Sequence, residues 1–599
     1  MKTYYVGLAT TFHDPALAII DEKGEIIFAE ATERHYQDKR AMGCLPDSME
    51  WANQLIKQVT DPSAKFVIAG SWNHQMHRFL KLLNFLGITS ARKIFRYDQR
   101  FATACATKHE GLYVCLMQLN SMNGAGAGWS MALAKHHNNR NIEFRNYPHH
   151  WTHAMGACRM SGFEETACMV VDSNGQRGSI SYFGYKNGSL NEIKEIKGAA
   201  SLGALYTAFT GYCGFQPDKG EEWKVMGLAP YGKPIEAILE VLRELVIIDG
   251  INIKYRSKKH YQKLVAHLEA AKRSGDQPII EAADLAATGQ AFYEEAMSRL
   301  INNFHGMTGG ERLVLSGGCG LNSSYNGKII EQTPFEEVFI PCAPGDDGNA
   351  VGAAYLAYHA DFPTNIPLPK RQSPYLGSRL SPRGLHNMRT FGRLPKIRQL
   401  PDTLYEETAK LLAEGKLVGW ARGRAEFGPR ALGNRSILAD PRAADMKDKI
   451  NAKVKFREEY RPFAPSILHE FGPEYFENYQ ETPYMERTLR FKEEVRDRVP
   501  AVVHVNGTGR LQSVSASLNE PYYKLIKAFY AITGVPILLN TSFNVMGKPI
   551  IHSVEDALSV FFTSGLDALV LEDMLIEKPD AEEIDNRTRA SDRTATPVG

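Results

Sequence analysis

One basic run in the last third of the chain limits what the chain can fold into. Residues 423–465 read GRAEFGPRALGNRSILADPRAADMKDKINAKVKFREEYRPFAP, with glycine or proline at 428, 429, 433, 441 and 462. A solvated helical face could also be basic, but it would show a helical apolar period and few such residues. Stiff turns instead hold the cations in fixed directions, as recognition of a polyanion requires. The run therefore predicts a site for a phosphate-rich substrate, and its cations are Arg430, Arg435, Lys453, Lys455, Arg457 and Arg461.

Length and charge limit the classes of protein that remain. A chain of 599 residues is too long for one core, so we expect two or three domains. The apolar content of 43% and charged content of 23% are typical of a globular protein. The net charge of +2 excludes a surface that is basic throughout, so any anion site must be local. Nucleic acid is not an expected partner.

The cysteines and the apolar runs predict a soluble cytoplasmic protein. The eight cysteines are scattered without a CxxC pair, which favours a reducing compartment over a zinc ribbon or a disulfide framework. His13, Asp14 and Pro15 stand where a signal peptide would need an apolar stretch. No run approaches about 18 apolar residues, so we expect no membrane span.

The N-terminus alternates strands with a polar turn. Residues 3–9 read as a strand, TTFHDP as a turn, and ALAIID and GEIIFAEA as two further strands. This order opens an actin-like ATPase fold, although any β-meander could begin in the same way. His13 and Asp14 lie at the tip of the turn. Asp14 either serves the turn itself, as aspartate often does, or the pair supplies a base near a reacting hydroxyl.

Four residues have the chemistry of a metal site. His149 and His153 are four residues apart, so on a helix they share one face; a polar helix N-terminus is the alternative. Asp172 ends the buried strand CMVVD, and Asp346 is expected at the end of the strand EVFIP. Two imidazoles and two carboxylates suit Fe(II), Mn(II) or Zn(II).

The remaining segments predict the following elements. We expect a loop at NGAGAGW, mainly helix over 236–305, and an anion-binding turn where the strand before SGG meets a helix. A Pro-rich linker is expected at 362–400, and a second domain beyond it opens with a helix and a strand. Arg510 is expected in a turn, and NTSFN offers either a polar loop or hydrogen-bonding ligands. The polar end after about 583 is expected to be disordered.

Taken together, these motifs resemble the antibiotic O-carbamoyltransferase family, whose members carbamoylate tobramycin, cephalosporins, novobiocin and rhizobial Nod factors. They cover essentially the whole chain from residue 7 to about 575, and EFGPRALGNRSILADPR and RPFAP are highly specific. The matching runs are HDPALAII, HHWTHAMGA, KVMGLAPYG, LSGGCGLN, PGDDGNAVGAA, EFGPRALGNRSILADPR, NAKVKFREEYRPFAPS, NGTGRLQ and LLNTSFNVMGKPI.

The resemblance implies an α/β fold in two parts. An actin-like (ASKHA) N-terminal domain, similar to the tRNA-threonylcarbamoyl transferase subunit, would occupy 1–361, and a YrdC-like α/β domain would occupy 401–578, with 362–400 as linker and 579–599 as tail. The C-terminal domain would make carbamoyl-adenylate from carbamoyl phosphate and Mg-ATP. The N-terminal domain would then pass the carbamoyl group to a hydroxyl of a small-molecule natural product, with iron as the metal. A homodimer is an open option.

The resemblance also implies roles for individual residues. The metal ligands would be His149, His153, Asp172 and Asp346, and His13 with Asp14 would act at the acceptor. Gly317, Gly318 and Asn322 would bind the cofactor. The adenylation pocket would be lined by Arg430, Lys455, Arg461, Arg510, Asn540 and Ser542.

Three motifs depart from the family pattern near these positions. The usual VVDGxGE is VVDSNGQ at 170–176, so Ser173 replaces glycine and glutamine replaces glutamate at 176. HVDGT is HVNGT, with Asn506, and GDAG is GDDG, with Asp347.

Other functions use related modules. Threonylcarbamoyl transfer to tRNA is one, although the near-neutral charge and the lack of a basic tail weaken it. A non-catalytic, nucleotide-binding scaffold of actin-like fold is another. Hydrogenase-maturation carbamoylation is excluded because its acylphosphatase domain and CxxC motifs are missing from the sequence. The acceptor stays open among aminoglycosides, β-lactams, macrolides, toxins and sugars.

Overall fold

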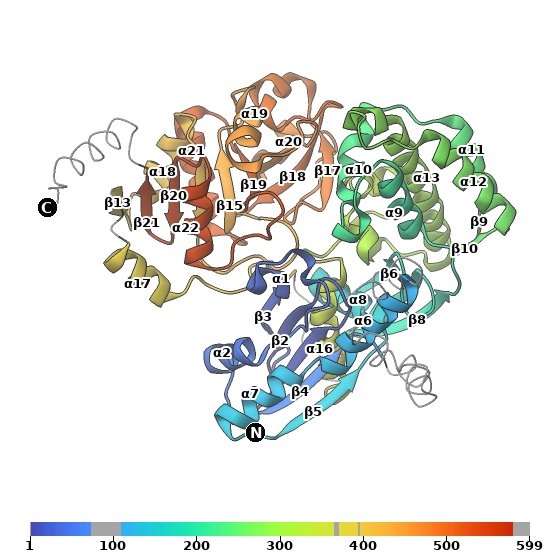
Figure 1. Ribbon diagram of the computed structural model, residues 1–599, viewed down its shortest axis with the longest axis horizontal. Helices are drawn as coiled ribbons and strands as arrows, with labels where there is room; N and C mark the ends of the chain where they lie inside the picture. Colours follow the sequence, from blue (N-terminus) through green and yellow to red (C-terminus); the bar gives the residue numbers. More distant parts are fainter. Residues whose placement is uncertain (1, 74–109, 364–370, 393, 395, 579–599) are drawn as a thin grey trace, which may run out of the picture. The chain divides into compact units, whose positions relative to one another are not determined.

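The chain forms two compact α/β units in the computed structural model, which describes residues 2–73, 110–363, 371–392, 394 and 396–578 (Figure 1). Unit 1 comprises Met1–Gly377 with the short segments Glu426–Arg430 and Tyr484–Leu489. Unit 2 comprises Ser378–Ala425, Ala431–Pro483 and Arg490–Gly599. The predicted α/β class is confirmed.

Unit 1 contains the same sheet topology twice. The first sheet has the order β3-β2-β1-β4-β5 and the second the order β8-β7-β6-β11-β12. In each sheet three antiparallel strands come first, and the two later strands run parallel to the first of them. This duplication is the actin-like architecture that the N-terminal strands predicted. The strands are β1 (Thr3–Ala9), β2 (Ala16–Ile20), β3 (Ile26–Ala31), β4 (Lys65–Gly70), β5 (Ile142–Asn146), β6 (Glu165–Val171), β7 (Ile180–Lys186), β8 (Ser189–Ile196), β11 (Arg312–Ser316) and β12 (Glu337–Phe339).

Helices cover both faces of the first sheet. Trp51 of α2 and Trp129 of α7 pack in a buried cluster with Val6 and Leu8 of β1 on one face. Gly7, which points to the opposite face, lies against α16. The helices of unit 1 are α1 (Thr32–Tyr36), α2 (Met49–Val59), α6 (Glu110–Gly124), α7 (Ala127–His137), α8 (His149–Ser161), α9 (Leu202–Tyr212), α10 (Glu222–Leu228), α11 (Glu236–Leu245), α12 (Lys258–Ala271), α13 (Ala283–Thr308), α14 (Ser323–Asn326), α15 (Ile329–Gln332) and α16 (Asn349–Asp361).

Glycine brings α8 and α16 into backbone contact. A β-carbon at Gly352 of α16 would lie 1.7 Å from the carbonyl oxygen of Thr152 in α8. A β-carbon at Gly156 of α8 would lie 3.0 Å from the nitrogen of Gly352. No side chain fits between the helices at these positions, so the N-terminal turn of α8 lies directly against the start of α16.

Unit 2 is built on a nine-stranded mixed sheet of order β13-β21-β20-β14-β15-β19-β16-β18-β17, which Figure 1 shows in yellow to red. The basic run contributes β15, α19, a π-helix at Asn451–Lys455 and β16. This confirms the prediction that the run is not a single helical face. The strands of this sheet are β13 (Lys396–Gln399), β14 (Val418–Ala421), β15 (Arg435–Ala439), β16 (Ala464–Leu468), β17 (Arg487–Arg490), β18 (Thr508–Val514), β19 (Ile537–Ser542), β20 (Ala568–Leu571) and β21 (Met574–Glu577). Of β17, only Arg490 is grouped with unit 2. The helices are α17 (Pro382–Phe391), α18 (Leu404–Ala413), α19 (Met446–Ile450), α20 (Gly472–Tyr475), α21 (Glu520–Thr533) and α22 (Val554–Thr563).

The segment Glu426–Arg430 is bonded within unit 1. The guanidinium of Arg34, which is 1% exposed, donates to the carbonyl of Gly428 at 2.8 Å and lies 3.6 Å from the carboxylate of Glu426. The nitrogen of Phe427 donates to the carbonyl of Pro374 at 2.7 Å. Arg34 and Glu426 are both fully buried, so each supplies the counter-charge that the other needs away from water.

Several local predictions were wrong. NGAGAGW is not a loop, because α6 and α7 run through it with a break only at residues 125–126. The range 236–305 is mainly helical, as predicted, but it also includes a hairpin, β9 (Val246–Asp249) and β10 (Asn252–Tyr255). Arg510 lies in β18 and not in a turn. The predicted linker 362–400 contains α17 and β13; its boundaries stay a prediction, and the predicted tail lies outside the described residues.

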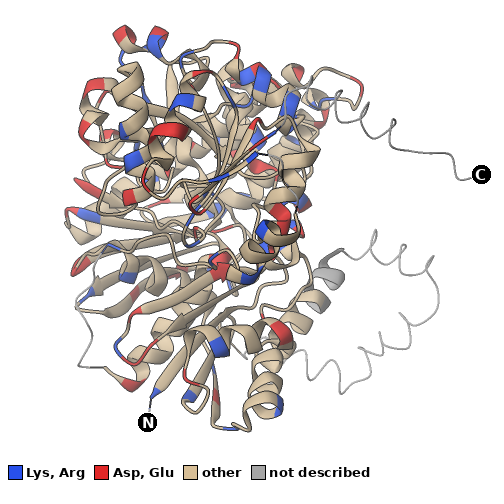
Figure 2. Cartoon of the chain, turned by 90° about the vertical axis from the view of Figure 1, so that its left-hand side faces the viewer, with Lys and Arg blue, Asp and Glu red and all other residues tan. Residues whose placement is uncertain are grey.

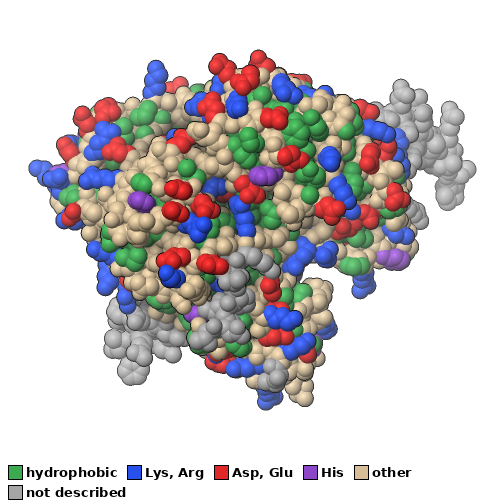
Figure 3. Space-filling view, turned by 180° about the vertical axis from the view of Figure 1, so that it is seen from behind, with side chains coloured by type: hydrophobic (Ala, Val, Ile, Leu, Met, Phe, Trp, Pro, Cys, Tyr) green, Lys and Arg blue, Asp and Glu red, His purple; other side chains and the backbone are tan. Residues whose placement is uncertain are grey.

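Charges of both signs are mixed over the surface. Figures 2 and 3 show acidic and basic side chains interspersed on the described parts of the faces they draw. This mixture agrees with the net charge of +2.

The contact between α8 and α16 predicts the effect of one methyl group. We expect Gly352→Ala to destabilise unit 1 by about 3 kcal/mol or more, because the new β-carbon would meet backbone that cannot move alone. Gly306→Ala in α13 is the matched helical control, since nothing lies within 4 Å of a β-carbon there. Thermal unfolding should show a lower Tm for Gly352→Ala and an unchanged or slightly higher Tm for Gly306→Ala. Equal Tm values for both variants would contradict the packing.

Candidate metal centre and active site

The first turn and a half of α8 presents two imidazoles on one face. His149 begins the helix after Pro148, and His153 follows one turn later. Their exposed fractions are 1% and 2%. The helical spacing predicted from the sequence is therefore confirmed, and both rings point away from water.

The two carboxylates reach the same place from separate segments. Asp172 follows β6 directly, as predicted. Asp346 was expected at the end of a strand, but β12 ends at Phe339, and Asp346 instead opens a 3₁₀ turn that leads into α16. Its position thus depends on the contact between α16 and α8 rather than on the sheet edge.

The four side chains form one compact cluster. The Nε2 atom of His149 lies 3.3 Å from Asp172 and 3.4 Å from Asp346, and the Nε2 atom of His153 lies 3.5 Å and 3.2 Å from the same carboxylates. One ligand atom from each residue falls within 4.8 Å of all the others. Ligands bound tetrahedrally at 2.0–2.1 Å stand roughly 3.4 Å apart. The residues therefore fit a divalent cation.

The charges of the cluster depend on one another. Burial disfavours the charged imidazole, but Asp346 and Asp172 outweigh it and raise the pKa of His149 to about 9. At Asp172, burial and repulsion from Asp346 favour the protonated carboxyl. Hydrogen bonds from His149 and His153 outweigh both effects and hold the pKa of Asp172 well below its usual range. Two carboxylates this close and this buried require cationic partners, which a metal ion supplies as well as protons do.

A second layer of side chains holds the cluster. The side-chain amide nitrogen of Asn349 lies 3.1 Å from His153 Nε2 and 3.5 Å from His149 Nδ1. The hydroxyl of Thr152 donates to the side-chain oxygen of Asn349 at 2.7 Å. The ring of Trp72 lies 4.6 Å from that of His149. Such outer contacts fix ring orientation at metal sites.

Gln176, one of the departures from the family pattern, also belongs to this layer. Its carbonyl oxygen accepts from the backbone nitrogen of His149 at 3.2 Å, and its amide donates to the side chain of Asn73 at 2.9 Å. A glutamate could accept but not donate, so the replacement matches the Asn73 partner.

His13 and Asp14 lie beside the metal ligands. The Nδ1 atom of His13 lies 2.9 Å from the carboxylate of Asp14 and 3.7 Å from that of Asp346. Burial opposes the imidazolium, yet these carboxylates prevail and raise the pKa of His13. The predicted pair is thus brought together with the cluster, and Asp14 does more than serve its turn.

The three residues predicted to bind the cofactor lie in different surroundings, and their binding role stays a prediction. Gly318 lies beside the cluster, since a β-carbon there would be 3.1 Å from Asp172. Gly317 adopts φ +89°, which glycine tolerates. Asn322 instead caps α14 through Tyr325 and bonds to Gln290, so its amide already has protein partners. The helix expected after SGG is a 3₁₀ turn followed by the four residues of α14.

In unit 2 the buried Lys455 meets the NTSFN motif. Its ammonium group donates to the carbonyl of Ser542 and, at 2.7 Å, to the side chain of Asn544. Lys455 is 4% exposed, and these oxygens supply hydrogen-bond acceptors to its buried ammonium group. Asn544 was missed as a site residue, although the alternation of Asn540, Ser542 and Asn544 at the end of β19 and just after it was a signal for it.

Other residues predicted to line the adenylation pocket bond to partners other than Lys455. Asn540 donates to Ser466 and Gln512, which makes it part of a buried polar network. Arg461 pairs with Glu458 at 3.1 Å. Arg430 belongs to the segment that groups with unit 1. Arg510 lies in β18, and their binding roles stay predictions.

Sequence reasoning missed Arg40 and Asp347 in unit 1. The guanidinium of Arg40 donates to the carboxylate of Asp14 at 2.9 Å. Asp347, the GDDG departure, is 9% exposed, and burial raises its pKa to about 7. No short motif marked Arg40, whereas the extra aspartate of GDDG was visible but had no assigned role.

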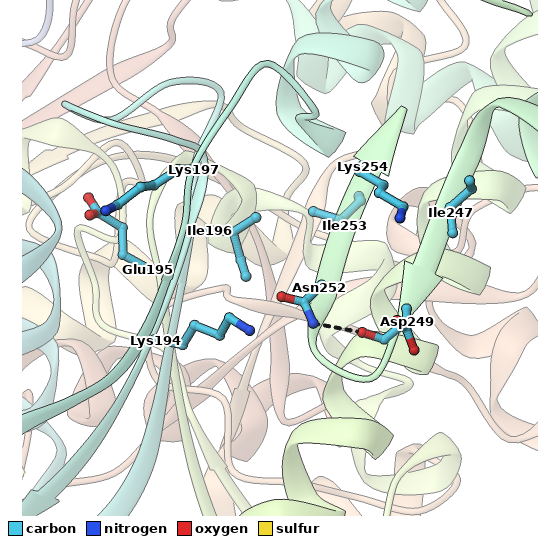
Figure 4. Close-up of a pocket in the computed structure, with 9 residues that line it drawn as sticks. All are labelled: Lys194, Glu195, Ile196, Lys197, Ile247, Asp249, Asn252, Ile253 and Lys254. Carbon is cyan, nitrogen blue, oxygen red and sulfur yellow. Dashed lines mark hydrogen bonds between the residues drawn. The ribbon is translucent and has the colours of Figure 1, made fainter. Parts of the chain in front are cut away.

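A separate hollow of about 480 Å³ lies between β8 and the β9–β10 hairpin. Figure 4 shows it lined by Lys194, Lys197 and Lys254 together with acidic and apolar residues of the same strands. None of the predicted site residues lines it.

The fold and the site define a class: a two-unit α/β protein with an actin-like half that holds a buried His₂Asp₂ cluster. Comparison with known families specifies it. The family described as "Carbamoyltransferase N-terminus" matches residues 4–355, and "Carbamoyltransferase C-terminus" matches residues 409–578. The chain belongs to the carbamoyltransferase family, which confirms the resemblance that the motifs indicated and makes the protein a carbamoyltransferase enzyme.

Individual relatives agree with this assignment. The chain is 39% identical over 437 residues to nodulation protein NolNO of Sinorhizobium fredii, covering 72% of this chain and 63% of the relative. It is 29% identical over 577 residues to nodulation protein U of Rhizobium tropici, covering 90% of each. The crystal structure of T. kodakarensis HypF aligns with 62% of this chain and 50% of its own at 14% identity and a TM-score of 0.33, which is too low to carry weight.

Within the described ranges, no helix combines the length and the apolar character that crossing a bilayer demands.

The cluster predicts a specific loss of metal. We expect His149→Ala to bind Fe(II) or Zn(II) at least about a hundredfold more weakly than the wild-type chain, because one of four ligands is lost. His137→Ala is the control, since His137 bonds to Asn53 on α2, outside the cluster. Elemental analysis after metal loading and desalting measures the difference. Equal metal content in both variants would show that the cluster is not the binding site.

Proposed function

We propose that the chain is an ATP-dependent O-carbamoyltransferase acting on a hydroxyl of a small-molecule natural product. The observation that carries the proposal is the buried His149–His153–Asp172–Asp346 cluster with the His13–Asp14 pair beside it. A metal ligand set and a base in contact with each other suit attack of a hydroxyl on an activated carbonyl.

Donor activation belongs to unit 2 in this proposal. Water hydrolyses carbamoyl phosphate to carbamate and phosphate, and a carbamate oxygen then attacks the α-phosphate of Mg-ATP to give carbamoyl-adenylate, with pyrophosphate as the leaving group. Both substrates are polyanions, so bringing them together requires fixed cations. Lys455 supports this role because its buried ammonium group is fixed by bonds to oxygens of Ser542 and Asn544. Arg461 and Arg510 are the proposed further cations.

Transfer belongs to unit 1. When bound, the divalent ion, for which we propose Fe(II), supplies a Lewis acid at the cluster. Asp14 accepts from His13 Nδ1 and so leaves Nε2 to take the proton of the acceptor hydroxyl. The hydroxyl oxygen bonds to the carbamoyl carbon, the bond from that carbon to the phosphate oxygen breaks, and AMP leaves as an anion. Burial around the cluster limits attack by water.

The cytoplasm is the proposed site of action. The cysteines that the structure describes are unpaired thiols, of which Cys158, Cys168, Cys213 and Cys342 are buried. Such thiols suit a reducing compartment.

The acceptor proposal is tested with a panel of hydroxylated compounds. An aminoglycoside, a hydroxymethyl cephalosporin, a macrolide and a free sugar are each incubated with the metal-loaded enzyme, ATP and carbamoyl phosphate. Mass spectrometry should show one compound with a carbamoyl group in place of a hydroxyl hydrogen, dependent on ATP. If pyrophosphate is released but no compound is carbamoylated, the proposed acceptor class is wrong. If no pyrophosphate is released, the proposed formation of carbamoyl-adenylate is refuted.

Lys455 provides a test of the donor half alone. We expect Lys455→Ala to lower pyrophosphate release by about a hundredfold, because the cation that faces the developing phosphate charge is lost. Lys453→Ala, an exposed lysine of the same π-helix, should keep the wild-type rate. A normal rate for Lys455→Ala would remove this residue from the donor site.

A further inference from the structure

Backbone strain is concentrated beside His13. Asp14 has φ +52°, Arg40 has φ +62° and Ala41 has φ +40°, values that residues other than glycine rarely adopt. The strained residues are bonded to each other, since the nitrogen of Asp14 donates to the carbonyl of Arg40 at 2.8 Å. Strain of this kind persists only where the surrounding contacts enforce it.

The side chain of Arg40 grips the carboxylate of Asp14. Its Nε atom donates to the two carboxylate oxygens at 3.3 and 3.1 Å, and Nη2 donates to Oδ2 at 2.9 Å. Nη1 donates to the carbonyl of Asp218 at 3.1 Å. This fork can be satisfied only in one orientation, so Asp14 is fixed in direction as well as in distance.

Other contacts hold Arg40 itself. Its backbone nitrogen donates to the carboxylate of Glu33 at 2.8 Å. Gly220, with φ +66°, packs against its stem, because a β-carbon there would lie 3.2 Å from Cδ. Backbone and side chain are thus both fixed, although Arg40 is 19% exposed at the side chain.

The contacts form a relay that ends at His13. Arg40 holds Asp14, and Asp14 holds His13 at Nδ1. Within the described residues no hydrogen bond reaches His13 Nε2, which is the atom left for a substrate. Whatever sets the orientation of Asp14 therefore sets the direction of that atom.

The positive charge of Arg40 also offsets the repulsion among several nearby carboxylates. Asp14, Glu33, Asp346 and Glu222 all interact with it or with Asp14 electrostatically. Without the guanidinium, Asp14 would face these carboxylates, and among its described contacts only His13 could carry a positive charge. The Asp14 side chain could then move away from the imidazole ring of His13. A lysine would restore the charge but not the fork.

We propose that Arg40 is a positioning residue that acts through Asp14 to aim His13 at the acceptor hydroxyl. The inference rests on the proposed function for its chemistry, and on the relay for its geometry. Arg40 itself takes no proton and makes no bond to the reacting atoms.

The first experiment separates transfer from donor activation. Arg40→Ala is assayed with the acceptor that the wild-type enzyme carbamoylates, and separately with hydroxylamine, which attacks carbamoyl-adenylate without a protein base. We expect kcat for the acceptor to fall about a hundredfold, KM to change little, and hydroxylamine trapping to stay within about twofold. An equal loss in both assays would overturn the proposal, because Arg40 would then serve donor formation.

Rescue and a matched control test the fork. Guanidinium added to Arg40→Ala should restore part of the acceptor rate, and Arg40→Lys should recover less than guanidinium does. Arg243→Ala removes an exposed arginine that also grips a carboxylate, that of Glu295, and should keep the full rate. No rescue by guanidinium would count against positioning by the fork.

A double mutant tests the route through Asp14. If Arg40 acts only through Asp14, the pair Asp14→Asn and Arg40→Ala should lose no more rate than the worse single variant. Rate losses that multiply would mean an independent role and would overturn the proposal.

A structural measurement decides the inference even if the proposed function fails. A crystal structure of Arg40→Ala should show His13 rotated or spread over several positions, with His149, His153, Asp172 and Asp346 in place. A His13 ring that keeps its place would refute the positioning role. Absence of pyrophosphate and carbamoylation in the wild-type enzyme would refute the proposed function and leave this structural test standing.

Discussion

The structure depends on keeping two imidazoles and two carboxylates together away from water. Any one of these groups buried alone would be costly, and together they compensate one another only at distances near 3.4 Å. That requirement explains features some way from the cluster: the glycines at which α8 meets α16, the 3₁₀ turn that delivers Asp346, and the second layer of Asn349, Gln176 and Trp72. The fold of unit 1 can therefore be understood as the frame that keeps four charges close.

Unit 2 contains a buried cation, the ammonium group of Lys455. This group donates to oxygens of Ser542 and Asn544. A cation acts more strongly on an anion in a buried site than in water, because the effective dielectric constant is lower there. A buried cluster with two carboxylates in unit 1 and a buried lysine in unit 2 thus occur in one chain whose net charge is only +2.

Local periodicity accounts for what the sequence could predict. His149 and His153 were placed correctly because a helical spacing needs no tertiary information, and Asp172 because a buried strand ends at it. Asp346 was assigned to the cluster by its motif, but its secondary structure was wrong, since a loop separates it from β12. Arg40 could not be predicted: its role depends on a left-handed backbone and on a partner 26 residues away. Arg510 was expected in a turn because glycines precede it, yet it lies within the strand β18 (Thr508–Val514).

The Arg34–Glu426 pair has a consequence for how this protein can be divided. Glu426 comes from a five-residue stretch that is flanked on both sides by unit 2 but completes unit 1. Cutting the chain between the family's two regions would leave Arg34 buried without its carboxylate, at a cost of about 3–5 kcal/mol. The two halves are consequently not modules that recombination could exchange at a single crossover. They are expected to be inherited, expressed and engineered as one piece.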